Sequence, residues 1–531
     1  MKQTILLMSF MMTTFVFAQK QGITIKESKV YKMTTARVQN DYILPDEQGG
    51  FITISSKRSG FLVNPKVFEV YATQYDENMN LLKTKTFKFN KAGIKGNIKG
   101  TFVYKHHLYL MNMEQNLRKK YYSFKKIDGN IDDGTVSSKE FFRLNFVYPK
   151  NEVNLFVNPG SLYYQKLQYY SDVNFFNPKI FIRFSKNNRF FAIVYRDLKE
   201  TPVTYHIQVF NHDFKPVFKQ QITQSIASKL LYISDLKVDD TNGTVYVITQ
   251  TYKKDPLKKR RVLNTDNTQN FMIYRITKTG VSSYIIKPEK VIEKLKLQLG
   301  DNVNVFGFFR DSYQDLNNID GFCRFNFTKD LVLQNSSYQN FKQSLVTAGT
   351  RKGLRKSKNH TMVVRQSFLL SDGDMIVNAE DLYVPLMMKK EEREEDIREI
   401  VGDLFSIRVA KNGQIIQVKN IYKKQVVKPR LALHSFFGTY LNGHEYLFFT
   451  DSPLEKPAKN KAFYLKGSER KNLNLVKISN NGDLQKSVLY EPKRSKFRFM
   501  PIEGTIIGPK TLIIPAKDHL YIKFFKINIT D

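Results

Sequence analysis

Short stretches in which apolar and polar residues alternate run through almost the whole chain. Residues 70–75, 271–276 and 473–478 are typical examples. A period of two places successive side chains on opposite faces, so these stretches predict half-buried β-strands. Each is followed by a few residues drawn from Asn, Asp, Gly and Lys, such as Asn480-Asn481-Gly482, and then by another strand. Turns of this kind between alternating strands predict β-hairpins.

A second hairpin, whose second strand is more apolar, precedes each of these. Eight such inner hairpins occur, with turns at Gly49, His106, Asn187, Asn242, Asp301, Asp372, Asn442 and Pro509. Two successive hairpins make a four-stranded antiparallel sheet, the unit of a propeller blade. After the eighth inner hairpin only one more strand, 520–527, remains before the chain ends. A strand within 23–33 is therefore expected to complete the last blade and to remove two open sheet edges.

The repeated double hairpin resembles the β-propeller superfold in general and covers nearly the whole chain after its N-terminal segment. It resembles no particular propeller family, since the Trp-Asp dipeptide of WD40 repeats cannot occur in a chain without Trp. The expected fold is an all-β, single β-propeller of about eight four-stranded blades, closed by an N-terminal strand. Two smaller propellers, or a propeller with a sandwich, are the alternatives.

One segment departs from the β pattern. Residues 389–396 are almost all charged, and Ile397, Ile400 and Val401 follow at helical spacing. Glu394 and Arg398 form a favourable i,i+4 pair. These features predict one short helical insertion at about 386–402 in the sixth blade, capped by Gly402.

The first 18 residues have the pattern of a secretory signal peptide. Lys2 is followed by an apolar stretch from residue 5 to residue 17, and Ala18 offers a small-residue cleavage site. The stretch is too short to span a bilayer, and an uncleaved anchor is the alternative. No cysteine follows it, which excludes a lipoprotein. The propeller is thus expected to occupy 19–531 and to be exported to the periplasm of a bacterium or secreted, with no transmembrane segment.

Charge and cysteine content narrow the function classes. Lys and Arg number 84 and Asp and Glu 49, a formal net charge of +35. Such a field attracts anions, although it can also reflect only the composition of a Lys- and Asn-rich proteome. No nucleic-acid recognition motif is present. Cys323 is the single cysteine, so neither a disulfide framework nor a Cys-based zinc cluster is possible. Its alternating surroundings predict a buried strand position.

Candidate binding residues lie on long loops, where functional side chains are common. The long loops join second and third strands at 251–270, 381–403 and 451–472, or join blades at 146–178 and 341–360, and propeller topology opens both classes on one face. Two of them carry basic clusters and one is rich in aromatic and amide side chains, which suit sugars or simply pack the loop. The candidates are Lys258, Lys259, Arg260, Arg261, Arg351, Lys352, Arg355, Lys356, Tyr163 and Tyr164.

Signals for catalysis or metal binding are weak. The segment 128–134 begins like a calcium loop, but Lys139 stands where a bidentate Glu is required, so a hairpin turn is expected. Five carboxylates recur after second strands and are either a ring of acids or loop-initiating residues; they are Asp197, Asp255, Asp311, Asp381 and Asp451. No cofactor and no metal is expected. The sequence favours an exported, non-catalytic protein that binds an anionic polysaccharide or an acidic protein, and the alternative is a propeller-based polysaccharide hydrolase or lyase.

Overall fold

The computed structural model describes most of the chain between residues 22 and 530. The segments outside the description are 34–37, 47, 60–65, 90–93, 95–96, 105–106, 117, 146–179, 198–200, 228–229, 254–267, 312–317, 347–359, 384–398, 424, 428–434, 452–471, 492–496 and 519. Within the described part, the chain forms eight antiparallel sheets. The fold is the expected all-β propeller of eight four-stranded blades.

Contacts between Cα atoms divide the chain into two compact units. Unit 2 comprises Arg58–Glu69 and Phe87–Leu431 and holds blades 2 to 6. Blade 2 is β7 (Asn97–Tyr104), β8 (His107–Asn116), β9 (Tyr121–Asn130) and β10 (Val136–Asn145); blade 3 is β11 (Ile180–Phe184), β12 (Phe190–Arg196), β13 (Val203–Asn211) and β14 (Pro216–Gln224); blade 4 is β15 (Leu231–Val238), β16 (Val245–Tyr252), β17 (Thr268–Thr277) and β18 (Gly280–Ile286).

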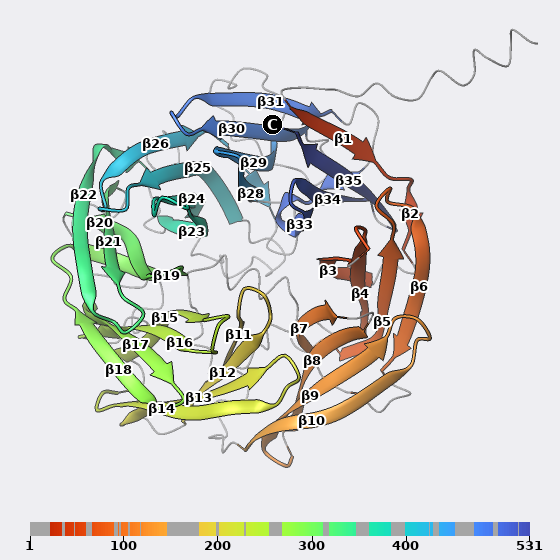
Figure 1. Cartoon of the computed structure of the whole chain (residues 1–531), viewed down its shortest axis with the longest axis horizontal. Coiled ribbons are helices and arrows are strands. Elements are labelled where there is room, and N and C mark those ends of the chain that lie inside the picture. The colour runs from red at the N-terminus through yellow and green to blue at the C-terminus, as the bar shows by residue number, and fades with distance from the viewer. Residues whose placement is uncertain are drawn as a thin grey trace, which may run out of the picture. The chain divides into compact units, whose positions relative to one another are not determined.

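Unit 2 also contains blades 5 and 6. Blade 5 is β19 (Val291–Leu299), β20 (Val303–Arg310), β21 (Asn318–Phe327) and β22 (Leu333–Val346); blade 6 is β23 (His360–Leu369), β24 (Met375–Tyr383), β25 (Glu399–Val409) and β26 (Ile415–Ile421), with β27 (Gln425–Val427) beside β25. In each blade of unit 2 the four main strands pair in chain order, so the first and the fourth are the edge strands. Figure 1 shows β11, β15 and β19 at the inner edge of unit 2.

Unit 1 comprises Met1–Lys57, Val70–Thr86 and Ala432–Asp531 and holds blades 7 and 8 and most of blade 1. Blade 1 is β3 (Val38–Pro45), β4 (Phe51–Ser59), β5 (Lys66–Tyr75) and β6 (Leu81–Lys88); blade 7 is β28 (Phe436–Leu441), β29 (His444–Asp451), β30 (Asn472–Ser479) and β31 (Leu484–Tyr490); blade 8 is β32 (Arg498–Phe499), β33 (Thr505–Gly508), β34 (Thr511–Asp518), β35 (Tyr521–Ile529), β1 (Ile23–Glu27) and β2 (Tyr31–Lys32).

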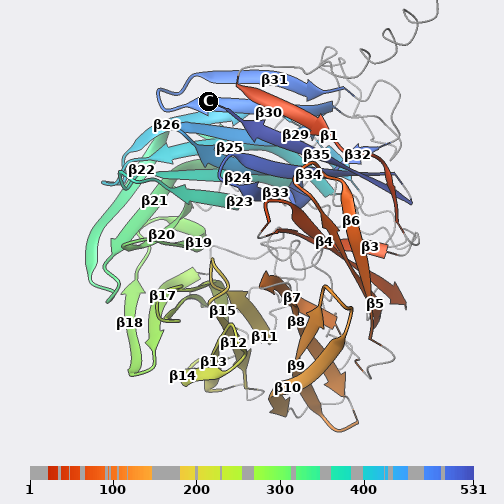
Figure 2. The same cartoon turned by 45° about the vertical axis from the view of Figure 1, so that its right-hand side comes forward.

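The N-terminal strand completes the last blade, as the missing strand in the sequence predicted. Strand β1 pairs antiparallel with β35 from Ile23 opposite Ile529 to Glu27 opposite Phe525, and β2 continues the pairing along the same strand. The Ser28 N–H donates to the Phe524 carbonyl over 2.9 Å, and the Thr530 N–H donates to the Gly22 carbonyl over 2.7 Å. Both ends of the chain are thus bound into one sheet, which Figure 2 shows from a second direction.

The apolar core lies between neighbouring sheets rather than in one central mass. One layer packs blades 3 and 4 through Tyr205 and Val247, and another packs blades 4 and 5 through Phe271 and Leu295. In unit 1, Ile23 of the closing strand joins Tyr446 of blade 7 and Ile514 of blade 8 in a layer of the same kind. Aromatic and β-branched side chains suit these layers because both faces of each pleated sheet are covered.

The predicted helical insertion at 386–402 is wrong at its C-terminal end. Glu399 to Gly402 belong to strand β25, in which Ile400 pairs with Tyr383 on one side and with Val426 on the other. Residues 386–398 lie outside the described residues. The β-branched Ile400 and Val401 fit a pleated strand better than a helix. The described residues contain the short 3₁₀ turn η6 (Pro501–Glu503) and no α-helix.

Asn442-Gly443 illustrates how the turns determine strand register. Asn442 has φ +49° and Gly443 has φ +79°, so both residues adopt the left-handed conformation. This is the type I′ arrangement, whose twist matches that of the flanking strands. Leu441 then pairs directly with His444, and the β28–β29 hairpin proceeds without a register shift.

Closure by β1 predicts a specific effect on stability. Ile23 is 1% exposed and packs in the layer between blades 7 and 8. Ile23→Ala should lower the free energy of unfolding by about 2–5 kcal/mol, because it removes buried methyl groups and leaves a cavity. Val30 is 49% exposed, so Val30→Ala should change it by less than about 0.5 kcal/mol. Chemical denaturation measures both, and equal effects would contradict the closure.

Candidate functional site

All ten predicted binding residues lie outside the described residues, so the two basic clusters and the Tyr163-Tyr164 pair stay predictions. The strands that carry the basic loops are described. Tyr252 at the end of β16 pairs with Thr268 at the start of β17, and β22 ends at Val346 before β23 starts at His360. The second and fourth strands of an antiparallel sheet run in the same direction. Loops that follow β16 and β22 therefore leave the same edge of their blades.

The described members of the proposed ring of acids are tied to groups of their own blades. Asp197 contacts His206 Nε2 at 2.9 Å through Oδ1. Asp311 contacts Lys290 Nζ at 2.8 Å and accepts a 3.0 Å hydrogen bond from the Asn340 amide. Asp381 lies within β24 and is buried, not on a loop after the strand. Asp255 and the side chain of Asp451 lie outside the described residues. These contacts favour a structural role for Asp197 and Asp311.

The calcium-like segment is the predicted hairpin turn between β9 and β10. The Asn130 N–H donates to the Thr135 carbonyl, and the Gly134 N–H donates back to the Asn130 carbonyl. The Asn130 side-chain oxygen accepts from the Asp132 N–H at 2.8 Å, which is a turn-forming contact. Among the described residues, no group of three or more His, Cys, Asp or Glu side chains could hold a metal ion.

Charged side chains gather instead on the innermost strands of unit 2, at positions that the sequence analysis did not single out. Strands β7, β11, β15, β19 and β23 contain six basic residues and two acidic residues. The basic ones are Lys99, Arg183, Lys237, Lys294, Lys296 and Arg365, and the acidic ones are Asp235 and Glu293. The signal in the sequence was an alternating charge pattern, Asp235-x-Lys237 and Lys294-x-Lys296, in the first strands of the fourth and fifth inner hairpins.

Four of these residues interact electrostatically, with Asp235 in common. We call them the inner-strand cluster: Arg183 on β11, Asp235 and Lys237 on β15, and Lys296 on β19. The Asp235 carboxylate accepts the Leu297 N–H of the next blade at 2.9 Å and the N–H of Leu236 at 2.9 Å. All four charged side chains are half-buried. Three neighbouring blades therefore contribute to one cluster.

Cations on neighbouring strands affect the ionisation of Asp235. Burial by itself would raise the pKa of this carboxyl. Lys237 and Lys296, then the Leu297 N–H and the Arg183 guanidinium, outweigh burial and hold the pKa of Asp235 below its usual range. Asp235 is therefore ionised at neutral pH.

Bulges in the inner strands help to aim these side chains. The pairing of β15 with β16 shifts at Ser234, that of β19 with β20 shifts between Ile292 and Leu295, and that of β23 with β24 shifts at Arg365. A bulge inserts one residue and turns the side chains around it. The Ser234 hydroxyl uses this freedom to donate to the Leu295 carbonyl of the next blade at 2.9 Å. The bulges thus hold the inner strands of blades 4 and 5 together.

Blade 6 contains a second, fully buried charge cluster. Glu380 on β24 contacts Arg365 Nε at 2.7 Å through Oε2 and Lys423 Nζ at 2.5 Å through Oε1. The side chains of Glu380 and Lys423 are 0% exposed and that of Arg365 is 3% exposed. Asp403 accepts the backbone N–H of Lys423 at 3.3 Å. Because solvent cannot reach this cluster, it is suited to fix the fold of blade 6, not to bind a ligand.

Removal of the acid in this cluster should be costly. Glu380→Ala leaves two buried cations without their shared carboxylate and should lower the free energy of unfolding by about 3–5 kcal/mol. The matched control is the triple variant Arg365→Met, Glu380→Leu, Lys423→Met, which removes these three charges together and should cost less than Glu380→Ala. Urea denaturation of the wild type, Glu380→Ala and the triple variant measures these free energies of unfolding. A triple variant as unstable as Glu380→Ala would contradict this account.

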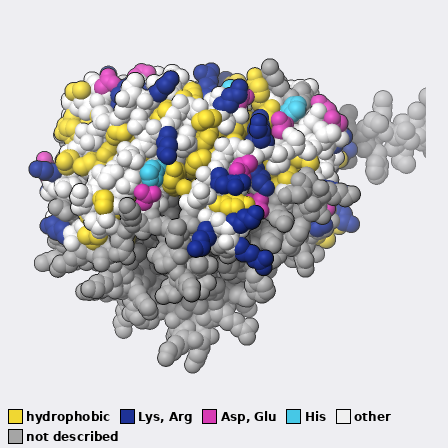
Figure 3. All heavy atoms as spheres, turned by 90° about the horizontal axis from the view of Figure 1, so that it is seen from below, with side chains coloured by type: hydrophobic (Ala, Val, Ile, Leu, Met, Phe, Trp, Pro, Cys, Tyr) yellow, Lys and Arg dark blue, Asp and Glu magenta, His cyan; other side chains and the backbone are white. Residues whose placement is uncertain are grey.

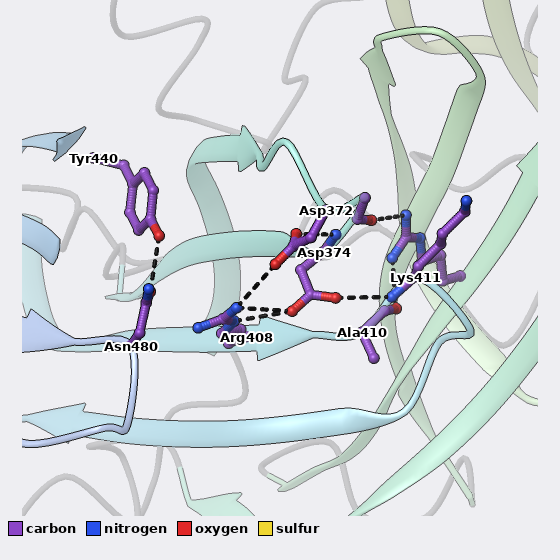
Figure 4. Close-up of polar contacts among 9 residues, drawn as sticks. Asp372, Asp374, Arg408, Ala410, Lys411, Tyr440 and Asn480 are labelled. Atoms are coloured by element: carbon purple, nitrogen blue, oxygen red, sulfur yellow. Dashed lines mark hydrogen bonds and ion pairs between the residues drawn. The ribbon is translucent and has the colours of Figure 1, made fainter. Parts of the chain in front are cut away.

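A polar cluster at the hairpin turns links blades 5 and 6 (Figure 4). Arg408 Nη2 lies 2.9 Å from Asp374 Oδ2 and 3.3 Å from Asp372 Oδ2, and the Lys411 N–H donates to Asp374 at 3.1 Å. Arg324 of blade 5 donates to the Ala410 carbonyl at 2.7 Å and to the neighbouring turn. These contacts satisfy turn carbonyls and hold two hairpins in place, which is a structural role.

The single cysteine occupies the predicted buried strand position. Cys323 in β21 is 0% exposed, and its thiol lies 3.4 Å from the Gly307 carbonyl. Burial raises the pKa of the Cys323 thiol to about 12. The thiolate is the reactive form, so the folded protein keeps this cysteine unreactive.

Thiol titration tests this placement. In the native protein at about pH 8, Cys323 should not react with a thiol reagent, whereas one thiol per chain should react after unfolding. The raised pKa stabilises the fold fully below the pKa of a free thiol, and this contribution falls as the pH rises toward about 12. Rapid labelling of the folded protein would contradict the burial.

The described surface carries basic groups in many places. Figure 3 shows Lys and Arg side chains interspersed with hydrophobic and acidic ones over the described part of one face. Exposed lysines stand at several hairpin turns of unit 2, namely Lys186, Lys215, Lys278 and Lys411. No helix in the described part is long and apolar enough to cross a bilayer.

No family model matches the chain. No curated protein matches it in sequence. Among solved structures, it is similar to the WD40 domain of SCAP from fission yeast, with 7% identity, a TM-score of 0.37 and coverage of 98% of this chain and 97% of that one. The β-propeller domain of the Trilobed protease from Pyrococcus furiosus has 9% identity, a TM-score of 0.32 and coverage of 86% and 97%. An apocarotenoid oxygenase mutant from Synechocystis has 9% identity, a TM-score of 0.32 and coverage of 93% and 88%. None of these likenesses bears on the function of this chain.

Proposed function

We propose that the protein is an exported, non-catalytic binding protein whose basic loop face holds an anionic polysaccharide. The observation that carries the proposal is the excess of positive charge, 84 basic against 49 acidic residues, which continues into the innermost strands of unit 2. A field of this size raises the local concentration of polyanions and speeds their association. The signal-peptide pattern of residues 1–18 supports a place outside the cytoplasm, where acidic polysaccharides are found.

The predicted loop face is the proposed contact surface because its two basic clusters belong to the segments 253–267 and 347–359, which follow β16 and β22, and these two strands end at the same edge of blades 4 and 5. The hairpin turns at the opposite ends of these blades are short and contain at most one lysine each. The alternative function, a polysaccharide hydrolase or lyase, has less support, since Asp197 and Asp311 contact cationic or imidazole groups within their own blades.

Charge reversal at matched positions tests the proposal. Changing Lys258, Lys259, Arg260 and Arg261 to Glu should weaken heparin binding by about tenfold or more. Added salt should also weaken heparin binding by the wild-type protein, because exposed charges are screened over about 8 Å at physiological ionic strength. The control changes Lys186, Lys215, Lys278 and Lys411 to Glu, which alters the net charge equally. Calorimetric titration of the purified full chain measures both.

Three results would count against the proposal. Equal losses in the two variants would mean that the charge acts only as a diffuse field. Tighter binding of poly-glutamate than of heparin would identify an acidic protein as the partner class. Release of reducing ends from a polysaccharide, abolished by Asp311→Asn, would establish the enzyme instead.

A further inference from the structure

Blade 4 ends in an edge strand whose composition differs from that of the other fourth strands of unit 2. Within the described part of the chain β18 pairs with β17 alone, and Figure 1 shows it at the outer edge of unit 2. The other fourth strands each contain a lysine, namely Lys139 in β10, Lys219 in β14, Lys342 in β22 and Lys419 in β26. Strand β18, Gly-Val-Ser-Ser-Tyr-Ile-Ile, contains no charged residue and no proline. Proteins use charged residues and proline to protect open edges from pairing, so β18 lacks this protection.

The geometry of β18 suits the addition of a further strand. It pairs with β17 over all seven of its residues without a register shift. Alternate residues of such a strand direct their N–H and C=O groups away from the partner, toward the free edge. One face of β18 is covered, since Ile286 packs in the layer between blades 4 and 5. On the other face Val281 is 40% exposed and Ile285 is 48% exposed, so apolar side chains lie beside the free backbone groups.

We propose that the free edge of β18 binds an extended peptide segment of another protein, with apolar residues at alternate positions and a carboxylate at each end. The backbone groups of an edge strand are matched by another extended backbone, and alternate side chains add specificity. Val281 and Ile285 offer contacts to the apolar side chains. Within three residues of either end of β18, Lys278 and Lys287 are exposed cations and Glu289 is the one acidic residue. The two lysines therefore favour an acidic partner.

The same charges disfavour a second copy of this chain as the occupant. Antiparallel pairing of two β18 edges about Ser283 would bring Lys278 of one copy close to Lys287 of the other, at both ends of the strand. Like charges on paired strands are destabilising. The formal net charge of +35 on each copy adds a repulsion at longer range. A separate, acidic peptide meets neither obstacle.

Fluorescence anisotropy of the full chain with a labelled peptide, Asp-Val-Thr-Val-Thr-Val-Asp, tests the backbone part of the proposal. Two further forms of the peptide are each N-methylated on one of the two alternate sets of amides. In an added strand only one of these sets faces β18. One methylated form should therefore bind at least about tenfold more weakly than the parent peptide, and the other should bind like it. The wild-type protein is used throughout, so loss of fold cannot produce this difference.

A double variant tests the apolar contacts. Val281→Thr, Ile285→Thr keeps β-branched side chains, which suit a strand, and should weaken binding by about threefold to tenfold. The matched control is Val332→Thr, Ile416→Thr, which makes the same changes beside β22 and within β26. Those two side chains are 62% and 52% exposed, and the control should bind the peptide like the wild type.

A second pair of variants tests the acidic character of the partner. Lys278→Gln, Lys287→Gln should weaken binding by about threefold or more at low salt, where exposed charges are screened least. Lys186→Gln, Lys411→Gln removes two exposed lysines from turns of blades 3 and 6 and should leave binding unchanged. Lysine variants that both bind like the wild type would contradict an acidic partner.

Three results overturn the proposal: a wild-type protein that does not bind the peptide, two methylated forms that bind equally, or unchanged binding by Val281→Thr, Ile285→Thr. Dimerisation of the wild type that this variant abolishes would identify a second copy as the occupant, and it would overturn the proposal as well. The loop residues 258–261 are unchanged in all these variants. Their heparin binding should equal that of the wild type, so failure of the peptide result and failure of the polysaccharide result are distinguishable.

Discussion

The pairing of β1 with β35 is the interaction on which blade 8 depends. Without it, blade 8 would end at an open strand of nine residues with unpaired backbone groups, a template for association with other chains. The pairing covers five consecutive residues of β1 and continues in β2. It ties residues that are about 500 positions apart in sequence, and the Glu27–Lys523 ion pair spans the same two strands. The first and last strands of the chain's described part therefore stabilise each other.

Polar groups between blades determine how neighbouring sheets are placed. The links on the inner strands of unit 2 run from Asp235 to the Leu297 N–H, from Ser234 to the Leu295 carbonyl and from Ser367 to Gln298. Apolar layers supply most of the favourable free energy but are not directional. Hydrogen bonds between buried groups add direction, because an unpaired partner would be costly. The inner-strand cluster lies on these same strands, which carry cations beside the residues that form the polar links.

The fold was largely predictable because its signal is local and repeated. Alternating strands and Asn-Gly turns such as Asn442-Gly443 specify hairpins without reference to the rest of the chain. The count of strands then required one from the N-terminus, and Ile23 supplies it. The helix prediction failed for the opposite reason. The charged run at 389–396 favoured a helix, whereas the β-branched Ile400 and Val401, which pair with strand β27, favour a strand.

The candidate site was harder to predict, since charge in a strand normally indicates a solvent-exposed face. Asp235, Lys237 and Lys296 gain their significance from being on innermost strands of adjacent blades, which a single strand pattern does not reveal. The predicted basic clusters lie on long loops, where functional residues are common, and these segments are outside the described residues. The position of a strand within its blade, more than the residue type, thus determines whether a charged side chain is solvated or half-buried.

Hydrogen exchange measured by mass spectrometry tests the closed propeller most directly. The account predicts that amides in the peptide containing residues 23–27 exchange as slowly as those in the peptide containing residues 521–529, because the two strands open together. Exchange of the 23–27 amides at the rate of an unstructured chain, with 521–529 still protected, would contradict closure by the N-terminal strand.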